Sequence, residues 1–228
     1  MKPPAYQPSK NFDKSTIVNR ICDYLRECIF SNELKPGEQI DINKISRTLS
    51  VSTTPIREAL KVLTEQGLLV HISYVGYFVV KLSSNDIKEL FDLRKSFELL
   101  ALKYIIGRNN LKAIANLETR IKEVRNDLSP SNLSIRRQIE EDLHIEFLLG
   151  GSNTRWLFKL AKGISDLISL STYLSHSPET ACKEHLKILQ AIKQNDLKIS
   201  SKLLEAHLER AKKEALESIR GSEAVKLK

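Results

Sequence analysis

The sequence predicts a mainly α-helical protein in two parts: an N-terminal unit of three helices and a two-stranded hairpin, and a C-terminal antiparallel bundle of about six helices. Three observations predict this. Two short helical patterns separated by a tight break lie between Asp41 and Gly67. Two β-rich runs follow in LLVHISYVGYFVV. From Ser83 onward, apolar residues recur at helical spacing without any strand pattern.

Composition divides the 228 residues into four segments. Residues 1–12 are Pro-rich and are expected to form a disordered arm, while 13–82 and 83–220 are expected to be the two units and 221–228 a tail. Apolar residues make up 41% of the chain, but no uninterrupted apolar run approaches the ~20 residues of a membrane span. The polar start has no signal-peptide core, and the three cysteines form no CxxC pair. We therefore expect a bacterial cytoplasmic protein with reduced thiols and no membrane partner.

The N-terminal unit begins with an expected helix from Lys14 to Ser31, followed by a turn at Lys35-Pro36-Gly37. A short helix is then expected from Ile42 to Leu49, capped by Asp41. The next helix follows Ser52, which stands at an N-cap position.

That helix has two distinct faces. Its buried stripe is expected to be Ile56, Ala59, Leu60 and Leu63. Thr53, Arg57 and Lys61, spaced four apart, project from a different face. Helix, short turn and helix with polar side chains on the second helix are typical of a helix-turn-helix DNA reader.

Double-stranded DNA is therefore the expected partner, and the net charge of +8 and pI near 9.3 are compatible with a polyanion. A homodimer would place two such helices in successive major grooves of a pseudo-palindromic operator. The side chains expected to read or position the DNA are Asn43, Ser52, Thr53, Thr54, Arg57 and Lys61. Ser52 is expected both to cap its helix and to hydrogen-bond phosphate.

The run from Ile29 to Val80 resembles the N-terminal domain of GntR-family transcriptional regulators. The matching pieces are LKPGEQI, STTPIREAL, EQGLL and the glycine of GYFVV. The resemblance implies a winged helix-turn-helix whose wing tip, near Gly76, approaches the minor groove. One position departs from the family pattern: an Arg usually follows the Ser that opens the recognition helix, and this chain has Thr53, which leaves the operator sequence open.

The remainder is expected to form helices at roughly 84–107, 110–128, 132–150, 153–175, 178–194 and 196–219. Residues 84–217 resemble the FCD domain, the all-helical effector-binding module of one large GntR subgroup. The matching pieces are LFDLRKSFELLA, the His144 segment ending in GGSN, EHLKILQAIKQND and EAHL.

Three histidines, His144, His185 and His207, lie on the apolar stripes of separate expected helices. One inward histidine is usually a satisfied core residue, but three converging imidazoles need three partners or a shared one. A divalent cation is the economical shared partner, and neutral imidazoles suit Zn²⁺, with Ni²⁺ as the alternative. Glu140, four residues before His144, projects from the same face and offers a carboxylate.

Metal-binding FCD domains have a carboxylate and three histidines in this order, so the resemblance implies Glu140, His144, His185 and His207 as ligands. The first is usually Asp, and the longer Glu leaves open a weaker or bidentate site, or one moved to Glu141. Arg94, mid-stripe on the 84–107 helix, has two readings. It forms a buried ion pair with Glu98, or it grips an effector carboxylate as the resemblance implies, and both can hold.

The sequence thus favours a DNA-binding transcriptional regulator whose operator binding is modulated by a small organic or sugar acid in a metal-containing pocket. Two other classes were weighed. A metal centre with an open position also suits an enzyme, but no separate nucleophile or general base accompanies it. The second is a DNA-binding dimer whose bundle only dimerises, because Glu140 in place of the usual Asp prevents metal binding.

Overall fold

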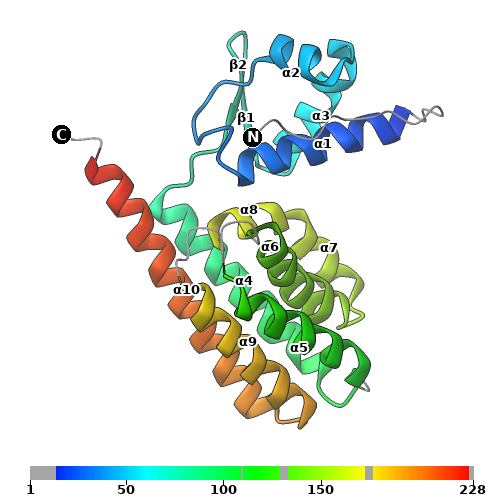
Figure 1. Ribbon diagram of the computed structural model, residues 1–228, viewed down its shortest axis with the longest axis vertical. Helices are drawn as coiled ribbons and strands as arrows, with labels where there is room; N and C mark the ends of the chain where they lie inside the picture. The colour runs from blue at the N-terminus through cyan, green and yellow to red at the C-terminus, as the bar shows by residue number, and fades with distance from the viewer. Residues whose placement is uncertain (1–13, 109, 129–132, 173–176, 226–228) are drawn as a thin grey trace. The chain divides into compact units, whose positions relative to one another are not determined.

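The computed structural model describes residues 14–108, 110–128, 133–172 and 177–225. The predicted arm at 1–12 lies outside these ranges. The chain divides into two compact units, Met1–Lys81 and Leu82–Lys228 (Figure 1). Within the described ranges, no helix combines the length and the apolar character needed to cross a bilayer.

The N-terminal unit is a winged helix-turn-helix, as predicted. Its elements are α1 (Lys14–Phe30), α2 (Ile42–Leu49), α3 (Thr53–Glu65), β1 (Leu69–Ile72) and β2 (Gly76–Val79). α1 packs against α3, and the centre of the unit is formed by the fully buried Leu25, Ile56, Leu60, Leu63 and Leu68. The apolar stripe predicted for α3 is therefore its buried face.

The turn between α2 and α3 is fixed by local polar contacts. Asp41 caps α2 as predicted, accepting a hydrogen bond on Oδ1 from the backbone N–H of Lys44 at 2.9 Å. α2 ends at Ser50, whose φ of 54° reverses the chain, and the hydroxyl of Ser46 donates to the carbonyl of Val51 at 2.6 Å. These contacts set the start of α3.

The wing is the antiparallel hairpin of β1 and β2, paired in register from Leu69 opposite Val79 to Ile72 opposite Gly76. Gln39 extends it through an isolated bridge to Phe78, and its side-chain amide donates to the carbonyl of Val75 at 2.9 Å. The amide ties the hairpin turn to the segment that precedes α2.

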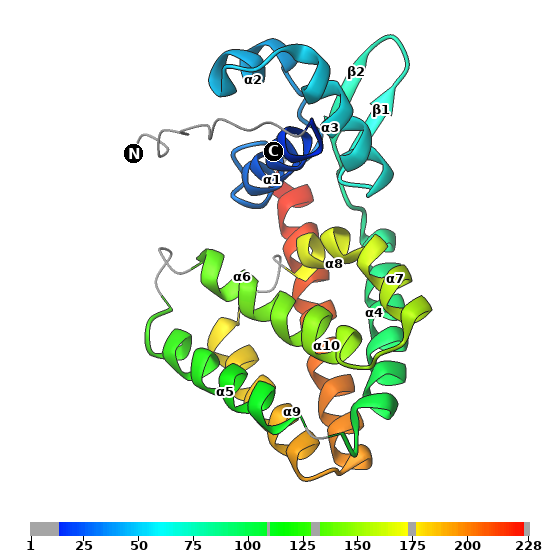
Figure 2. The same ribbon diagram turned by 90° about the vertical axis from the view of Figure 1, so that its right-hand side faces the viewer.

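The described part of the C-terminal unit contains seven α-helices and one π-helix, where the sequence predicted six helices. They are α4 (Ser84–Ile105), α5 (Leu111–Asn126), α6 (Leu133–Glu141), η2 (Asp142–Gly150), α7 (Arg155–Gly163), α8 (Ser165–Thr172), α9 (Pro178–Lys193) and α10 (Leu197–Val225). α10 packs along α4 and α9, α5 packs on α9, and η2 packs on α4 (Figure 2).

Three predicted boundaries were wrong. The helix expected at 153–175 is broken at Ile164, after the poor helix former Gly163, and the Ser165 hydroxyl donates to the carbonyl of Lys162 at 2.9 Å. The helix expected at 132–150 changes to π geometry at Asp142. The last helix continues to Val225, through most of the expected tail.

The π-helix ends at a position where only glycine fits. The backbone N–H of Gly151 donates to the carbonyls of Glu146 and Phe147 at 3.0 and 3.1 Å. A Cβ on Gly151 would lie 2.2 Å from the Phe147 oxygen, far inside contact distance. This π segment carries His144, and its geometry sets where that imidazole lies inside the bundle.

Candidate metal centre and nucleic-acid interface

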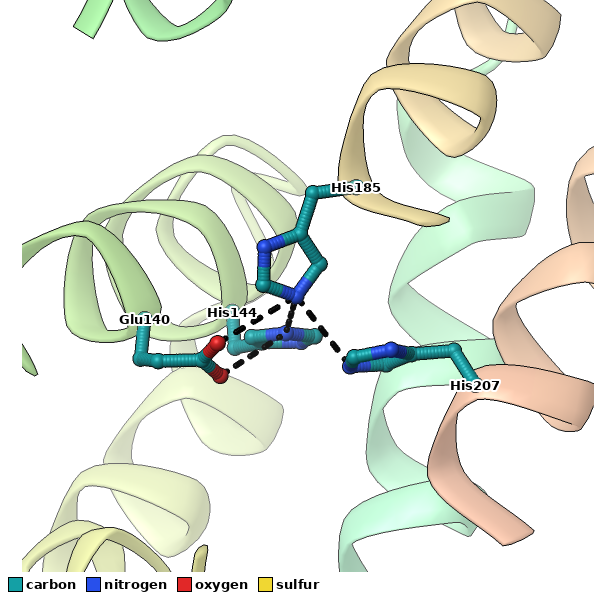
Figure 3. Close-up of side chains that lie close together, drawn as sticks. All are labelled: Glu140, His144, His185 and His207. Atoms are coloured by element: carbon teal, nitrogen blue, oxygen red, sulfur yellow. Dashed lines mark hydrogen bonds and ion pairs between the residues drawn. The ribbon is translucent and has the colours of Figure 1, made fainter. Parts of the chain in front are cut away.

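Four side chains from four helical segments meet inside the C-terminal bundle (Figure 3). Glu140 comes from α6, His144 from η2, His185 from α9 and His207 from α10. One donor atom from each lies within 4.8 Å of the others, and the three imidazoles are buried. The structure thus brings together the four residues predicted as metal ligands.

Four of the six spacings between these donors suit one tetrahedral cation. The Nε2 atom of His185 lies 3.3 Å from Nε2 of His144 and 3.2 Å from Nε2 of His207. Two nitrogens bound to a tetrahedral Zn²⁺ at ~2.0–2.1 Å would lie about 3.3–3.4 Å apart. The Glu140 oxygens lie 3.4 Å from Nε2 of His185 and 3.5 Å from Nε2 of His144.

One oxygen of the Glu140 carboxylate accepts no hydrogen bond from the described residues, and a bound cation would satisfy it. Its Oε2 atom is buried and has no hydrogen-bond donor among the residues that the structure describes. Leaving such an acceptor unsatisfied is costly. The neighbouring Glu141 instead lies 3.2 Å from the ammonium of Lys162. The carboxylate beside the imidazoles is therefore that of Glu140 and not that of Glu141.

Two carboxylates orient two of the imidazoles from behind. Nδ1 of His144 lies 2.6 Å from Oε2 of Glu98, and Nδ1 of His207 lies 2.7 Å from Oε2 of Glu184. With Nδ1–H donating to each carboxylate, each Nε2 keeps its lone pair directed into the cluster.

An arginine holds each of these carboxylates. Nε of Arg94 donates to Glu98 at 2.6 Å, which is the buried ion pair that one reading of the sequence predicted. Nε and a terminal nitrogen of Arg210 donate to Glu184 at 2.8 and 2.7 Å. Each imidazole is thus fixed by a carboxylate that is itself fixed by a guanidinium.

The protonation states suit metal binding. Burial lowers the pKa of His144 and of His185 well below the ordinary 6.5, so both rings are neutral near pH 7. Burial opposes ionisation of Glu184, but hydrogen bonds from His207 and Arg210 outweigh it and lower its pKa to about 2. Burial also opposes ionisation of Glu140, and the surrounding imidazoles and Arg94 hold its pKa at about 2. The site therefore offers lone pairs and an anionic carboxylate.

The cluster lines a cavity of about 420 Å³. Arg94 also lines it, and a terminal nitrogen of Arg94 lies 3.8 Å from Glu140. Arg94 thus pairs with Glu98 and also stands at the cavity wall. Its expected contact with an effector carboxylate remains a prediction.

The residues expected to contact DNA lie on the N-terminal unit, mostly in the open. Asn43, Ser52, Thr54, Arg57 and Lys61 are exposed and Thr53 is partly exposed. Arg57 and Lys61 form no hydrogen bond or ion pair with any residue in the described part of the chain. These two cations are therefore free for phosphates or base edges.

Two further expectations concern Ser52 and the wing. Ser52 stands at the N-cap position of α3, but its hydroxyl makes no capping hydrogen bond, so the predicted side-chain cap was wrong.

At the wing, Gly76 has a φ of 142°, and an added Cβ would lie 2.9 Å from the Gln39 amide nitrogen. Tyr74, at φ 63°, is fully exposed beside it. Glycine is thus required where the predicted wing tip bends back.

Sequence reasoning missed three residues of the C-terminal site, namely Glu184, Arg210 and Arg136. Glu184 adjoins His185 in the sequence but contacts His207, on another helix. Arg136 precedes Glu140 by four residues and lines the same cavity. This helical spacing was visible in the sequence and could have indicated Arg136.

Comparison with known proteins identifies the protein family that each unit matches. The profile of the bacterial regulatory proteins of the gntR family matches residues 17–79, and that of the FCD domain matches 89–210. The HTH-type transcriptional regulator YdhC of Bacillus subtilis is 27% identical over 191 residues, covering 80% of this chain and 84% of YdhC.

Two further proteins resemble the chain over most of its length. The Nta operon transcriptional regulator of Aminobacter aminovorans is 28% identical over 193 residues, 84% of this chain and 91% of the relative. The crystal structure of a GntR transcriptional regulator from Rhodococcus sp. RHA1 superposes with a TM-score of 0.71 at 21% identity, covering 88% of this chain and 98% of that one. All three carry names of transcriptional regulators. The two profile matches and the winged helix-turn-helix joined to a helical bundle show that the chain is a DNA-binding transcriptional regulator of the gntR family, in the group that carries an FCD domain.

Proposed function

We propose that this regulator holds a divalent cation at Glu140, His144, His185 and His207, and that a small acid bound beside the cation changes its affinity for an operator. The observation that carries the proposal is the convergence of three buried Nε2 atoms and a carboxylate oxygen that accepts no hydrogen bond from the described residues, at the wall of a cavity. Zn²⁺ suits three imidazoles and a carboxylate, and Ni²⁺ is the alternative. The cation would supply a Lewis-acidic position for an acid group.

The residues of the chain would orient that acid. Glu98 and Glu184 hold His144 and His207 in the tautomer that a cation needs. Arg94 stands at the cavity wall within 3.8 Å of Glu140, so its guanidinium can attract a carboxylate bound next to the cluster. An organic or sugar acid is the class of effector that this chemistry admits.

The N-terminal unit would read the operator through α3. Its exposed and unpaired Arg57 and Lys61, with Thr53 and Thr54, lie on the helix that such folds place in the major groove. Asn43 and Ser52 would hydrogen-bond phosphates, and the backbone near Gly76 would approach the minor groove. This activity requires the protein to share the bacterial cytoplasm with the chromosome.

A second copy of the chain would complete the reader, because one recognition helix covers one half of a pseudo-palindromic site. Adjacent helices α4 and α7 of the bundle expose apolar side chains to solvent. They are Leu93, Leu100, Tyr104, Trp156 and Leu160. A homodimer formed through this surface would bury them, and sedimentation of Trp156→Glu as a monomer beside a dimeric wild type would support it.

The experiment measures operator binding. A duplex selected from a random pool by the full chain is labelled, and its binding is followed by fluorescence anisotropy with organic and sugar acids, with and without Zn²⁺. At least one acid should shift operator affinity about fivefold or more, in the metal-loaded protein only. If no acid shifts the affinity, the other candidate is favoured, namely a DNA-binding dimer whose bundle only dimerises.

A further inference from the structure

The cavity beside the metal centre has room for a whole metabolite. Its volume of about 420 Å³ falls within the range of ~300–1,000 Å³ typical of small-molecule sites. The cluster of Glu140, His144, His185 and His207 occupies only part of the wall. The rest of the lining therefore constrains what kind of acid fits.

Most of that lining is apolar. Among the described residues the hydroxyl-bearing side chains that line the cavity are Ser169 and Ser177. A polyhydroxylated acid would place hydroxyls against the apolar part of this wall, where they would lack partners. The apolar part of the lining includes Val124, Ile139, Ile145, Ile168, Pro178 and Ala181. An acid with a hydrocarbon body suits it.

One guanidinium at the cavity wall has an unsatisfied donor. The Nε atom of Arg136 is buried and has no hydrogen-bond partner among the described residues. By contrast, Arg94 and Arg210, which line the same cavity, donate to Glu98 and Glu184. A buried donor without an acceptor in the chain takes one from water or from a bound molecule, and a ligand in this cavity would supply it.

The position of Arg136 sets the direction of that molecule. Arg136 and Glu140 are four residues apart on α6, on one face of the helix, and so stand about 6 Å apart along its axis. A ligand held at the metal centre and extended along α6 would bring its far end to Arg136. The apolar wall would contact the part in between.

We propose that the effector is a diacid with an apolar body, one acid group at the metal centre and the other at Arg136. This rests on the proposed function, which places an acid beside the metal. It narrows the class of effector, since it excludes sugar acids and monocarboxylates as the preferred ligands. Arg136 is thereby the residue that determines specificity for the second acid group.

Matched acids test the proposal on the Zn²⁺-loaded full chain by calorimetric titration and thermal shift. Adipate is compared with hexanoate, and terephthalate with benzoate, so that each pair differs in the second carboxylate, while gluconate represents polyhydroxylated acids. A charge-assisted hydrogen bond to Arg136 should make the preferred diacid bind at least about tenfold more tightly than its monoacid.

Variants assign that preference to one side chain. Arg136→Gln should remove most of the advantage of the diacid and leave monoacid affinity unchanged, and Arg136→Lys should restore part of it. Lys122→Gln, which removes an exposed charge from α5 outside the cavity lining, should change neither.

The outcomes separate this inference from the proposed function. Equal binding of diacids and monoacids, tighter binding of gluconate, or equal losses for both acids in Arg136→Gln would overturn the inference and leave a metal-dependent acid site standing. If no acid of any kind bound to the metal-loaded protein, the proposed function would fail together with the inference.

Discussion

His207 donates its Nδ1–H to Oε2 of Glu184 at 2.7 Å, and Arg210 grips the same carboxylate through two nitrogens. Glu98 and Arg94 repeat the arrangement behind His144. Both imidazoles are thus held with Nε2 toward the cluster before any cation binds. This preorganisation is a reason to expect tight metal binding.

Glu184→Gln should weaken metal binding. The amide removes the negative charge that fixes the His207 tautomer, so Zn²⁺ affinity should fall about 10- to 100-fold in competition with a chromogenic chelator. Glu179→Gln is the matched control, because Glu179 is an exposed residue of the same helix paired with Lys183. Equal affinities for wild type and Glu184→Gln would show that Glu184 does not support the site.

Arg94→Ala should destabilise the bundle as well as remove any response to acid. The substitution leaves Glu98 fully buried without its ion-pair partner, so the free energy of unfolding in urea should fall by about 3–5 kcal/mol. Lys95→Ala breaks a solvent-accessible pair with Glu209 and should cost no more than ~1 kcal/mol. A loss below ~1 kcal/mol for Arg94→Ala would contradict a structural role for the buried pair.

The metal-free protein should lose stability as the pH falls below 6.5. His144 and His185 have folded-state pKa values below the unfolded value of 6.5. Between these values the unfolded chain binds protons at these imidazoles and the folded chain does not, so protonation favours the unfolded state. Their contribution is complete above pH 6.5 and declines as the pH falls toward their folded pKa values. Urea unfolding between pH 8 and 5 with a chelator measures it.

His144→Asn provides the control for this titration. Removing one of the two buried imidazoles whose pKa is lowered should reduce the slope of stability against pH in the same window. A wild-type protein equally stable at pH 8 and pH 5 would contradict the burial of neutral imidazoles.

Arg57→Ala should weaken operator binding about 10- to 100-fold without changing the fold. Arg57 is exposed on α3 and makes no hydrogen bond or ion pair within the described chain, so its loss should leave the fold unchanged and remove the contact that we propose it makes to DNA. Anisotropy measures the affinity, and circular dichroism and sedimentation check the fold and dimer. Lys88→Ala, at an exposed lysine of α4, is the charge-matched control. Unchanged operator affinity in Arg57→Ala would refute the assignment of α3 as the reader.

The sequence sufficed to predict the class of fold because its signals were local. The stripe Ile56, Ala59, Leu60 and Leu63, the cap at Asp41 and the hairpin around Gly76 each lie within one element. The break at Ile164 gave only a weak signal, because the apolar pattern runs through it and a single glycine such as Gly163 is tolerated within helices. The π geometry from Asp142 was equally hidden, since apolar residues make up most of this nine-residue segment and so show no distinct period.

The four expected metal ligands could be singled out because each lay on the inward face of its own helix. Of the residues that support them, Arg94 and Glu98 could be predicted as a buried ion pair, but the contact of Glu98 with His144 and the role of Glu184 could not. Glu184 is adjacent to His185 and therefore points elsewhere on α9, and its contact with His207 exists only because α9 packs against α10. The lack of an acceptor for Nε of Arg136 among the described residues likewise depends on which neighbours the packing brings near it.

The most direct test of the account is a titration of the metal-free full chain with Zn²⁺ by calorimetry, for the wild type and for His185→Asn. His185 lies between the other two imidazoles, with its Nε2 at 3.3 and 3.2 Å from theirs. We predict one tight equivalent of metal in the wild type and a loss of at least about 100-fold in affinity for the variant. Wild-type protein that takes up no Zn²⁺, or a His185→Asn protein that binds it as tightly, would contradict the metal centre.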